Sequence, residues 1–167
     1  MKRFLIIFTI LFFTLKVDAT VLQAGVAIEQ VPQALYGNWR VNAKLDTTNS
    51  YATFKPQSVD FWNLIREGDV VTLENPYSGA NSSISIETVE GNLIVFSKKA
   101  NYGQNKILTD TVTIRLTGDK FSGINVLKLE SFSLIDNRLM KTETATYHIT
   151  GEKISGQSVL ENILSAP

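Results

Sequence analysis

The sequence predicts an all-β protein, built as an antiparallel meander of about eight to ten strands. Apolar and polar residues alternate with a period of two in successive segments, and turns rich in Gly, Asn and Asp separate those segments. No segment has a convincing helical period. A meander must protect its edge strands, which closure into a barrel removes and a two-sheet sandwich only shortens. We therefore expect a closed barrel, with a two-sheet sandwich as the alternative.

The expected elements follow one another from residue 20 onward. Residues 20–35 are a lead-in segment in which Leu22 to Val31 can form one or two helical turns before Pro32 stops them. From Trp39 to Leu45, apolar side chains alternate with polar ones, as in a strand with one buried face. Further strands are expected at 59–65, 70–73, 84–89, 93–96, 112–116 and 145–149, with turns at 67–69, 90–92 and 136–138.

One stretch of sequence occurs twice. Residues 115–123 match residues 148–156 almost position for position. Each copy predicts a strand end, a tight turn on Gly-acid-Lys beginning at Gly118 or Gly151, and then a new strand. A second glycine in each copy, Gly123 or Gly156, permits a bulge or a sharp coil of that strand. We expect the likeness to come from similar hairpins that converge on similar turn residues, and consecutive hairpins fit a meander whether or not that is its origin.

The first nineteen residues predict export. Lys2 and Arg3 precede an uncharged apolar run over residues 4–15, and Val17-Asp18-Ala19 follows, which is the layout of a secretory signal peptide. The apolar run is shorter than the roughly 20 residues that cross a bilayer. We expect a secreted or periplasmic protein with no membrane span once residues 1–19 are removed, a single barrel domain over 36–160 and a tail over 161–167.

The composition narrows the class of partner. Without residues 1–19 the chain has 13 Lys and Arg against 15 Asp and Glu. Such a near-neutral chain lacks the clustered positive charge that nucleic acid requires. There are no cysteines, so an exported chain depends on its core and sheet hydrogen bonds, which favours a bacterial periplasm. With no thiolate ligands and one histidine, no metal or other cofactor is expected.

The segment Leu35-Tyr36-Gly37-Asn38-Trp39-Arg40 resembles the G-x-W opening of lipocalins and related calycin barrels. In that superfamily a short turn or helix precedes the first strand, and the Trp plugs one end of the barrel. The resemblance implies a lipocalin-like barrel that Trp39 closes. Two features depart from the family pattern. Thr111 follows Thr109-Asp110 where lipocalins have an aromatic residue, and the late Arg that packs on the Trp has only Arg115 and Arg138 as candidates.

The first functional hypothesis is a non-enzymatic binding protein that holds a small, mostly apolar molecule in the barrel without a cofactor. Its lining is expected from the alternating apolar positions and from the Trp at the closed end: Trp39, Val112, Ile114, Leu116, Tyr147 and Ile149. The alternative is a structural or interaction domain of the cell envelope with a filled core. In that case two loops that carry Tyr77 and Tyr102 amid Asn, Gly and Ser would contact a protein or glycan.

Catalysis is the least favoured hypothesis. The single histidine, His148, has no neighbouring acid on its own strand face and is expected to be an ordinary solvent- or lumen-facing residue. Most carboxylates fall in predicted turns, where acids commonly bond the local backbone. Asp60 and Asp110 instead begin strands. They are the only two carboxylates that could serve an enzyme.

Overall fold

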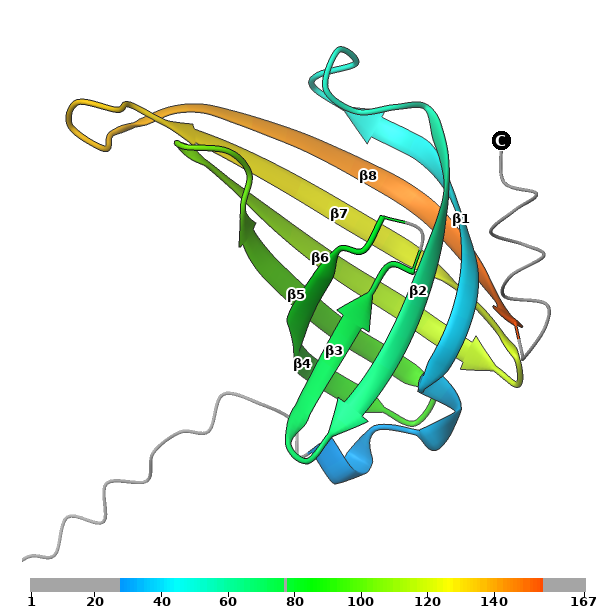
Figure 1. The fold of residues 1–167 in the computed structure, drawn as a ribbon. Coiled ribbons are helices and arrows are strands. Elements are labelled where there is room, and N and C mark those ends of the chain that lie inside the picture. The colour runs from blue at the N-terminus through cyan, green and yellow to red at the C-terminus, as the bar shows by residue number, and fades with distance from the viewer. Residues whose placement is uncertain (1–27, 77, 155–167) are drawn as a thin grey trace, which may run out of the picture.

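A computed structural model describes residues 28–76 and 78–154. Its eight strands form one antiparallel meander in which β1 also pairs with β8, so the hydrogen bonding closes into a ring (Figure 1). The expected all-β meander is confirmed, and the closed arrangement is observed rather than the sandwich. The strands are β1 Gly37–Thr48, β2 Gln57–Glu67, β3 Val70–Glu74, β4 Asn81–Glu90, β5 Leu93–Asn101, β6 Lys106–Thr117, β7 Lys120–Phe132 and β8 Leu139–Ile154. Two 3-10 turns precede them, η1 Ile28–Gln30 and η2 Gln33–Leu35.

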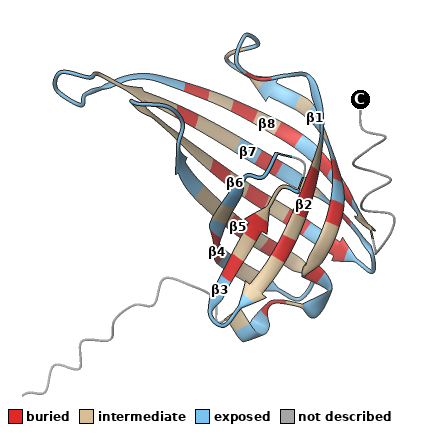
Figure 2. Cartoon of the chain, in the orientation of Figure 1, coloured by how far each residue is buried: buried red, intermediate tan, exposed pale blue. Residues whose placement is uncertain are grey.

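The two ends of the barrel differ. At the closed end β1 begins, and the short turns after β2, β4 and β6 lie there. At the open end lie the connections 49–56, 102–105 and 133–138, together with residues 75–76 and 78–80 between β3 and β4. Figure 2 shows buried segments alternating with exposed ones along β7 and β8, whereas the tip of their hairpin is exposed. In the described part of the chain, no helix is long and apolar enough to cross a bilayer.

Aromatic rings fill the lumen near the closed end. Phe121 lies between the two tryptophans, with ring centres 5.1 Å from Trp39 and 5.8 Å from Trp62, and Phe96 contacts Trp62 edge-on. Trp39 is completely buried. Aliphatic residues from the alternating positions of the strands surround the rings, among them Val41, Leu64, Val71, Ile94, Val112, Ile114 and Leu116. Burial of this layer is the main stabilising contribution that the alternating pattern makes.

The turn η2 and the side chain of Lys153 cover the closed end of the barrel. Leu35 of η2 is fully buried, and its carbonyl accepts a 2.8 Å hydrogen bond from Nε1 of Trp39. Nζ of Lys153 lies 5.3 Å from the centre of the Trp39 ring and donates to the Ala34 carbonyl at 2.9 Å. A cation therefore packs on the Trp, but it is neither of the two expected arginines. Arg115 bonds Asn92 and Arg138 belongs to the open-end turn 133–138, so both candidates were wrong.

The repeated sequence gives two different structures. The first copy forms the expected turn at Gly118, which has φ +59°. The turn expected at Gly151 is wrong, because β8 continues to Ile154 and pairs with the start of β1. Gly151 is needed there for a different reason, since a Cβ would overlap the ring of Phe121. Gly123 likewise leaves room for the backbone carbonyl of Thr113, and no register shift occurs there, so it permits close strand approach rather than a bulge.

The wall of the barrel is uneven in height. β3 pairs with β2 only over Asn63–Glu67, so residues 57–62 of β2 have no partner on the β3 side among the described strands. On the far side of β4, β5 pairs with β4 only from Leu93 to Ser97, so residues 98–101 of β5 have no partner on the β4 side among the described strands. The long strands β6, β7 and β8 extend well beyond this region (Figure 1). The upper lumen is therefore enclosed mainly by β1, β2 and β5 to β8.

Candidate functional site: the upper lumen

Above the aromatic layer the lumen is hollow. A cavity of about 160 Å³, here called the deep chamber, is bounded on the aromatic side by Trp62 and Val41. Its remaining lining is Ala43, Ser58, Asp60, Lys98, Asp110, Asn125, Leu127, Tyr147 and Ile149. Nearer the open end is a second space of about 270 Å³, here called the mouth. The two spaces share Ser58, Leu127 and Tyr147, so they are adjacent along the barrel.

One wall of the deep chamber carries an ion pair between a buried aspartate and a half-buried lysine. Asp110 of β6 faces Lys98 of β5, its partner in the register, with Nζ 3.4 Å from Oδ2. The other carboxylate oxygen accepts a 2.8 Å hydrogen bond from Nδ2 of Asn125 on β7. Burial raises the pKa of the Asp110 carboxyl; Lys98 and the Asn125 bond act in the opposite direction, and the charge of Asp60 raises it slightly.

Asp60 of β2 holds the second carboxylate of the chamber. Its Oδ1 accepts from the backbone N–H of Phe61 at 2.9 Å and from the side-chain amide of Asn75, and its Oδ2 accepts from Nε1 of Trp62 at 3.0 Å. These donors are all neutral. No cation among the described residues lies within ion-pair distance of Asp60, so its hydrogen bonds position the carboxylate without compensating its charge.

The mouth is mainly apolar. Its apolar lining comes from Leu108 of β6, from Leu127 and Leu129 of β7, from Tyr147 of the neighbouring strand β8 and from Phe54. Thr53, Lys55, Ser58 and Tyr102 complete the lining. Phe54 belongs to the connection 49–56 yet is only 6% exposed. The hydroxyl of Tyr147 donates a 3.0 Å hydrogen bond to the carbonyl of Lys55. The loop after β1 therefore contributes an apolar side chain to the mouth and is attached to the β8 wall.

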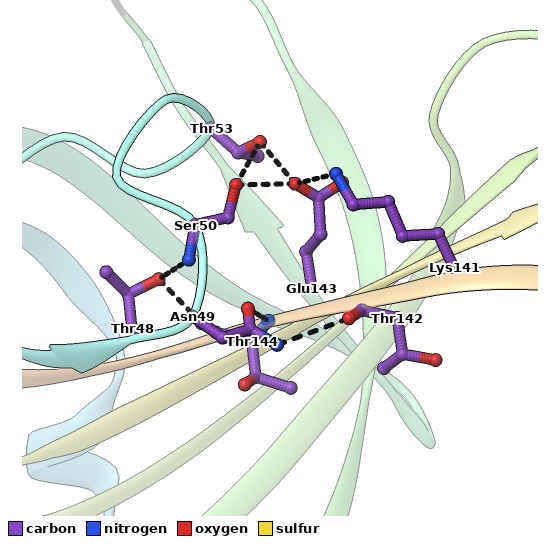
Figure 3. A network of polar contacts seen from close by, with 8 residues as sticks. All are labelled: Thr48, Asn49, Ser50, Thr53, Lys141, Thr142, Glu143 and Thr144. Carbon is purple, nitrogen blue, oxygen red and sulfur yellow. Dashed lines mark hydrogen bonds and ion pairs between the residues drawn. The ribbon is translucent and has the colours of Figure 1, made fainter.

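Glu143 fixes the same loop on β8 (Figure 3). Its Oε1 accepts hydrogen bonds from Ser50 at 2.5 Å and Thr53 at 2.8 Å, and it lies 2.9 Å from Nζ of Lys141. These three contacts, the Ser50 bond first, lower the pKa of the Glu143 carboxyl to about 2. Asn49 adds a reciprocal pair of bonds with Thr144, in which each backbone N–H finds an acceptor on the other residue. The loop is thus tied at several points.

The residues expected to line a ligand site separate into two groups. Tyr147 and Ile149 line the deep chamber, and Tyr147 also reaches the mouth. Trp39, Val112, Ile114 and Leu116 lie in the packed core beneath. Of the two loop tyrosines, Tyr102 is 58% exposed at the rim of the mouth, and Tyr77 lies outside the described residues. His148 lies away from the lumen on the exposed face, with Nε2 3.7 Å from Asp46 of β1.

Sequence reasoning had singled out Asp60 and Asp110 but missed Lys98, Asn125 and Glu143. A signal for Lys98 was present, because Ile94, Phe96 and Lys98 occupy every second position and therefore face the same side of β5. Asn125 follows Phe121 and Gly123 on β7 in the same way. Residues 28–76 and 78–154 hold no cluster of three or more His, Asp or Glu arranged to bind a metal ion.

Comparison with known proteins adds no assignment. Neither a protein-family model nor a curated protein sequence matches the chain.

Proposed function

We propose that this protein is an exported, non-enzymatic binding protein of lipocalin-like architecture that holds a small ligand in the upper lumen. The supporting observation is the division of the lumen into a filled half and a hollow half. A barrel with a purely structural role packs its interior to crystal-like density. Here the rings of the aromatic layer contact one another in a buried cluster near the closed end, while the deep chamber and the mouth stay open beside it.

The closed end supports the lipocalin-like part of the proposal. Gly37-Asn38-Trp39 starts the first strand, a 3-10 turn lies beneath it and a cation packs on the Trp. The first two of these features are those on which the resemblance rests, and the cation on the Trp, Lys153, takes the place of the family's late arginine. The expectation of export rests on residues 1–19, which lie outside the described residues.

The test is native mass spectrometry of the mature protein, purified gently from its own host compartment and compared with the denatured mass. The proposal expects a reproducible extra mass that denaturation removes. A matched pair of variants locates the ligand. Leu127→Trp places a large ring between the deep chamber and the mouth and should abolish the extra mass, whereas Leu134→Trp, at an exposed turn position, should retain it.

Two results would contradict the proposal. A bare mass for the wild-type protein would favour the alternative of an envelope interaction domain, with Tyr102 at an exposed rim. An extra mass that persists in a folded Leu127→Trp protein would place the ligand outside the lumen.

A further inference from the structure

The deep chamber has an uneven balance of charge. Lys98 and Asp110 face each other as an ion pair, and their charges compensate. The Asp60 carboxylate is held by neutral donors alone among the described residues. The chamber therefore presents one uncompensated negative charge to whatever occupies it, at a partly buried position where charge interactions are stronger than in bulk water.

A second, independent feature of the same chamber is an acceptor without a donor. Asn125 is 8% exposed, and its Oδ1 has no hydrogen-bond partner although its Nδ2 is bonded to Asp110. A buried polar atom of this kind is uncommon, because leaving it unpaired costs about 1–3 kcal/mol. The side chain lines the deep chamber. An occupant with an N–H or O–H group would supply the donor that the protein does not.

The lining of the mouth indicates which kind of chemical group would follow the polar group of a ligand. Phe54, Leu108 and Leu129 give it an apolar lining between the chamber and the open end. A molecule that enters from the open end thus meets an apolar zone first and a polar, negatively charged zone at the bottom. The arrangement suits an elongated molecule with its polar group at the leading end.

Building on the proposed function, we infer that the ligand is an amphipathic amine, with its ammonium group in the deep chamber and its apolar chain in the mouth. The ammonium group compensates Asp60 and offers N–H donors to Asn125. A fatty acid of the same length would add a negative charge beside Asp60 and Asp110, and its carboxylate has no proton to give to Asn125. Among the residues that the structure describes around the chamber, Lys98 is the one cation, and it is already paired with Asp110.

Calorimetric titration with three probes of equal chain length tests this inference: octylamine, octan-1-ol and octanoate at neutral pH. Octylamine is expected to bind at least about tenfold more tightly than octan-1-ol, which is a difference of about 1.4 kcal/mol, and octanoate most weakly. Asp60→Asn should weaken binding of the amine much more than binding of the alcohol, and so remove the advantage of the amine. The matched control Asp69→Asn, an exposed turn residue at the closed end, should leave all three affinities unchanged.

The outcomes separate the inference from the proposed function. If octanoate binds as tightly as octylamine or more tightly, the inference is wrong while the lumen remains a binding site. If folded Asp60→Asn protein keeps the preference for the amine, the role assigned to Asp60 is wrong. If none of the three binds the wild-type protein, this inference is wrong whatever native mass spectrometry shows. The three-probe comparison needs no variant, so a folding defect in Asp60→Asn would not prevent the test.

Discussion

Lys153 near the end of β8 and Trp39 near the start of β1 form a cation–π contact, with Nζ 5.3 Å from the ring centre. The same ammonium group donates to the carbonyl of Ala34 in η2. One side chain therefore joins the last strand, the first strand and the turn that seals the closed end. It does so where the ring of strands closes, at the register pair Trp39–Lys153.

Replacing Lys153 by Ala should lower the free energy of unfolding by about 1–2 kcal/mol, because both the cation–π contact and the bond to Ala34 are lost. Lys153→Arg should retain most of the stability, since a guanidinium group can make both contacts. Urea denaturation followed by tryptophan fluorescence measures the change. Lys120→Ala is a suitable control because its ion pair with Glu152 is exposed, and it should cost no more than a few tenths of a kcal/mol.

Gly151→Ala should destabilise the barrel by about 1–3 kcal/mol, because the added Cβ overlaps a Phe121 ring that is packed between two tryptophans. The penalty should shrink in a Phe121→Leu background, and a double-mutant cycle measures that coupling. Gly68→Ala is the control. It has open space but a φ of +60°, so its cost should be the same in both backgrounds. Equal penalties for Gly151→Ala in both backgrounds would contradict the steric explanation.

Acid should loosen the loop that follows β1. The pKa of Glu143 is lowered in the folded protein to about 2 from an ordinary value of 4.5. Its contribution to stability is therefore fully present above pH 4.5 and is lost as the pH falls toward 2. The protection factors of the amides in residues 49–54, obtained by dividing the intrinsic exchange rate at each pH by the observed rate, should fall over that interval. In Glu143→Gln the same amides should exchange faster at neutral pH and respond less to acid.

Lys98→Met should destabilise the protein at neutral pH by about 1–3 kcal/mol, because it leaves the buried Asp110 carboxylate without its cation. Burial raises the folded pKa of Asp110, and loss of Lys98 raises it further. A raised folded pKa favours the folded state at low pH, so the penalty should diminish as the pH is lowered through that value. Thermal unfolding of wild type and variant across a pH series measures this. A penalty independent of pH would show that lost packing, not charge, is responsible.

The fold was largely predictable because local alternation determines which side chains face inward. Val112, Ile114 and Leu116 follow Asp110 on one face of β6, and all four are buried in the barrel. The local sequence could not show that the turn expected at Gly151 is absent, because the residue types around Gly151 nearly match those of the observed turn at Gly118. Only pairing with the start of β1, more than 100 residues earlier, keeps that segment extended.

The site was less predictable than the fold. An alternating apolar face has the same sequence pattern whether its side chains fill a lumen or line a cavity. Val112 and Tyr147 were therefore both expected to line a ligand site, but in the structure Val112 lies in the packed core and Tyr147 lines the deep chamber. Lys98 was not expected to face the lumen, because the strand was expected to end at Phe96. The observed strand continues to Asn101, and that extension turns one lysine into the lumen.

The filled half and the hollow half of the lumen also imply different tolerance of change during evolution. At the closed end each ring of Trp39, Phe121 and Trp62 restricts its neighbours, so single replacements there are selected against through stability. The lining of the mouth bears fewer such constraints. Chains that descend from a common ancestor with this one are therefore expected to keep the aromatic layer while exchanging residues such as Leu108 and Leu129, so that the shape of the mouth changes without rebuilding the scaffold.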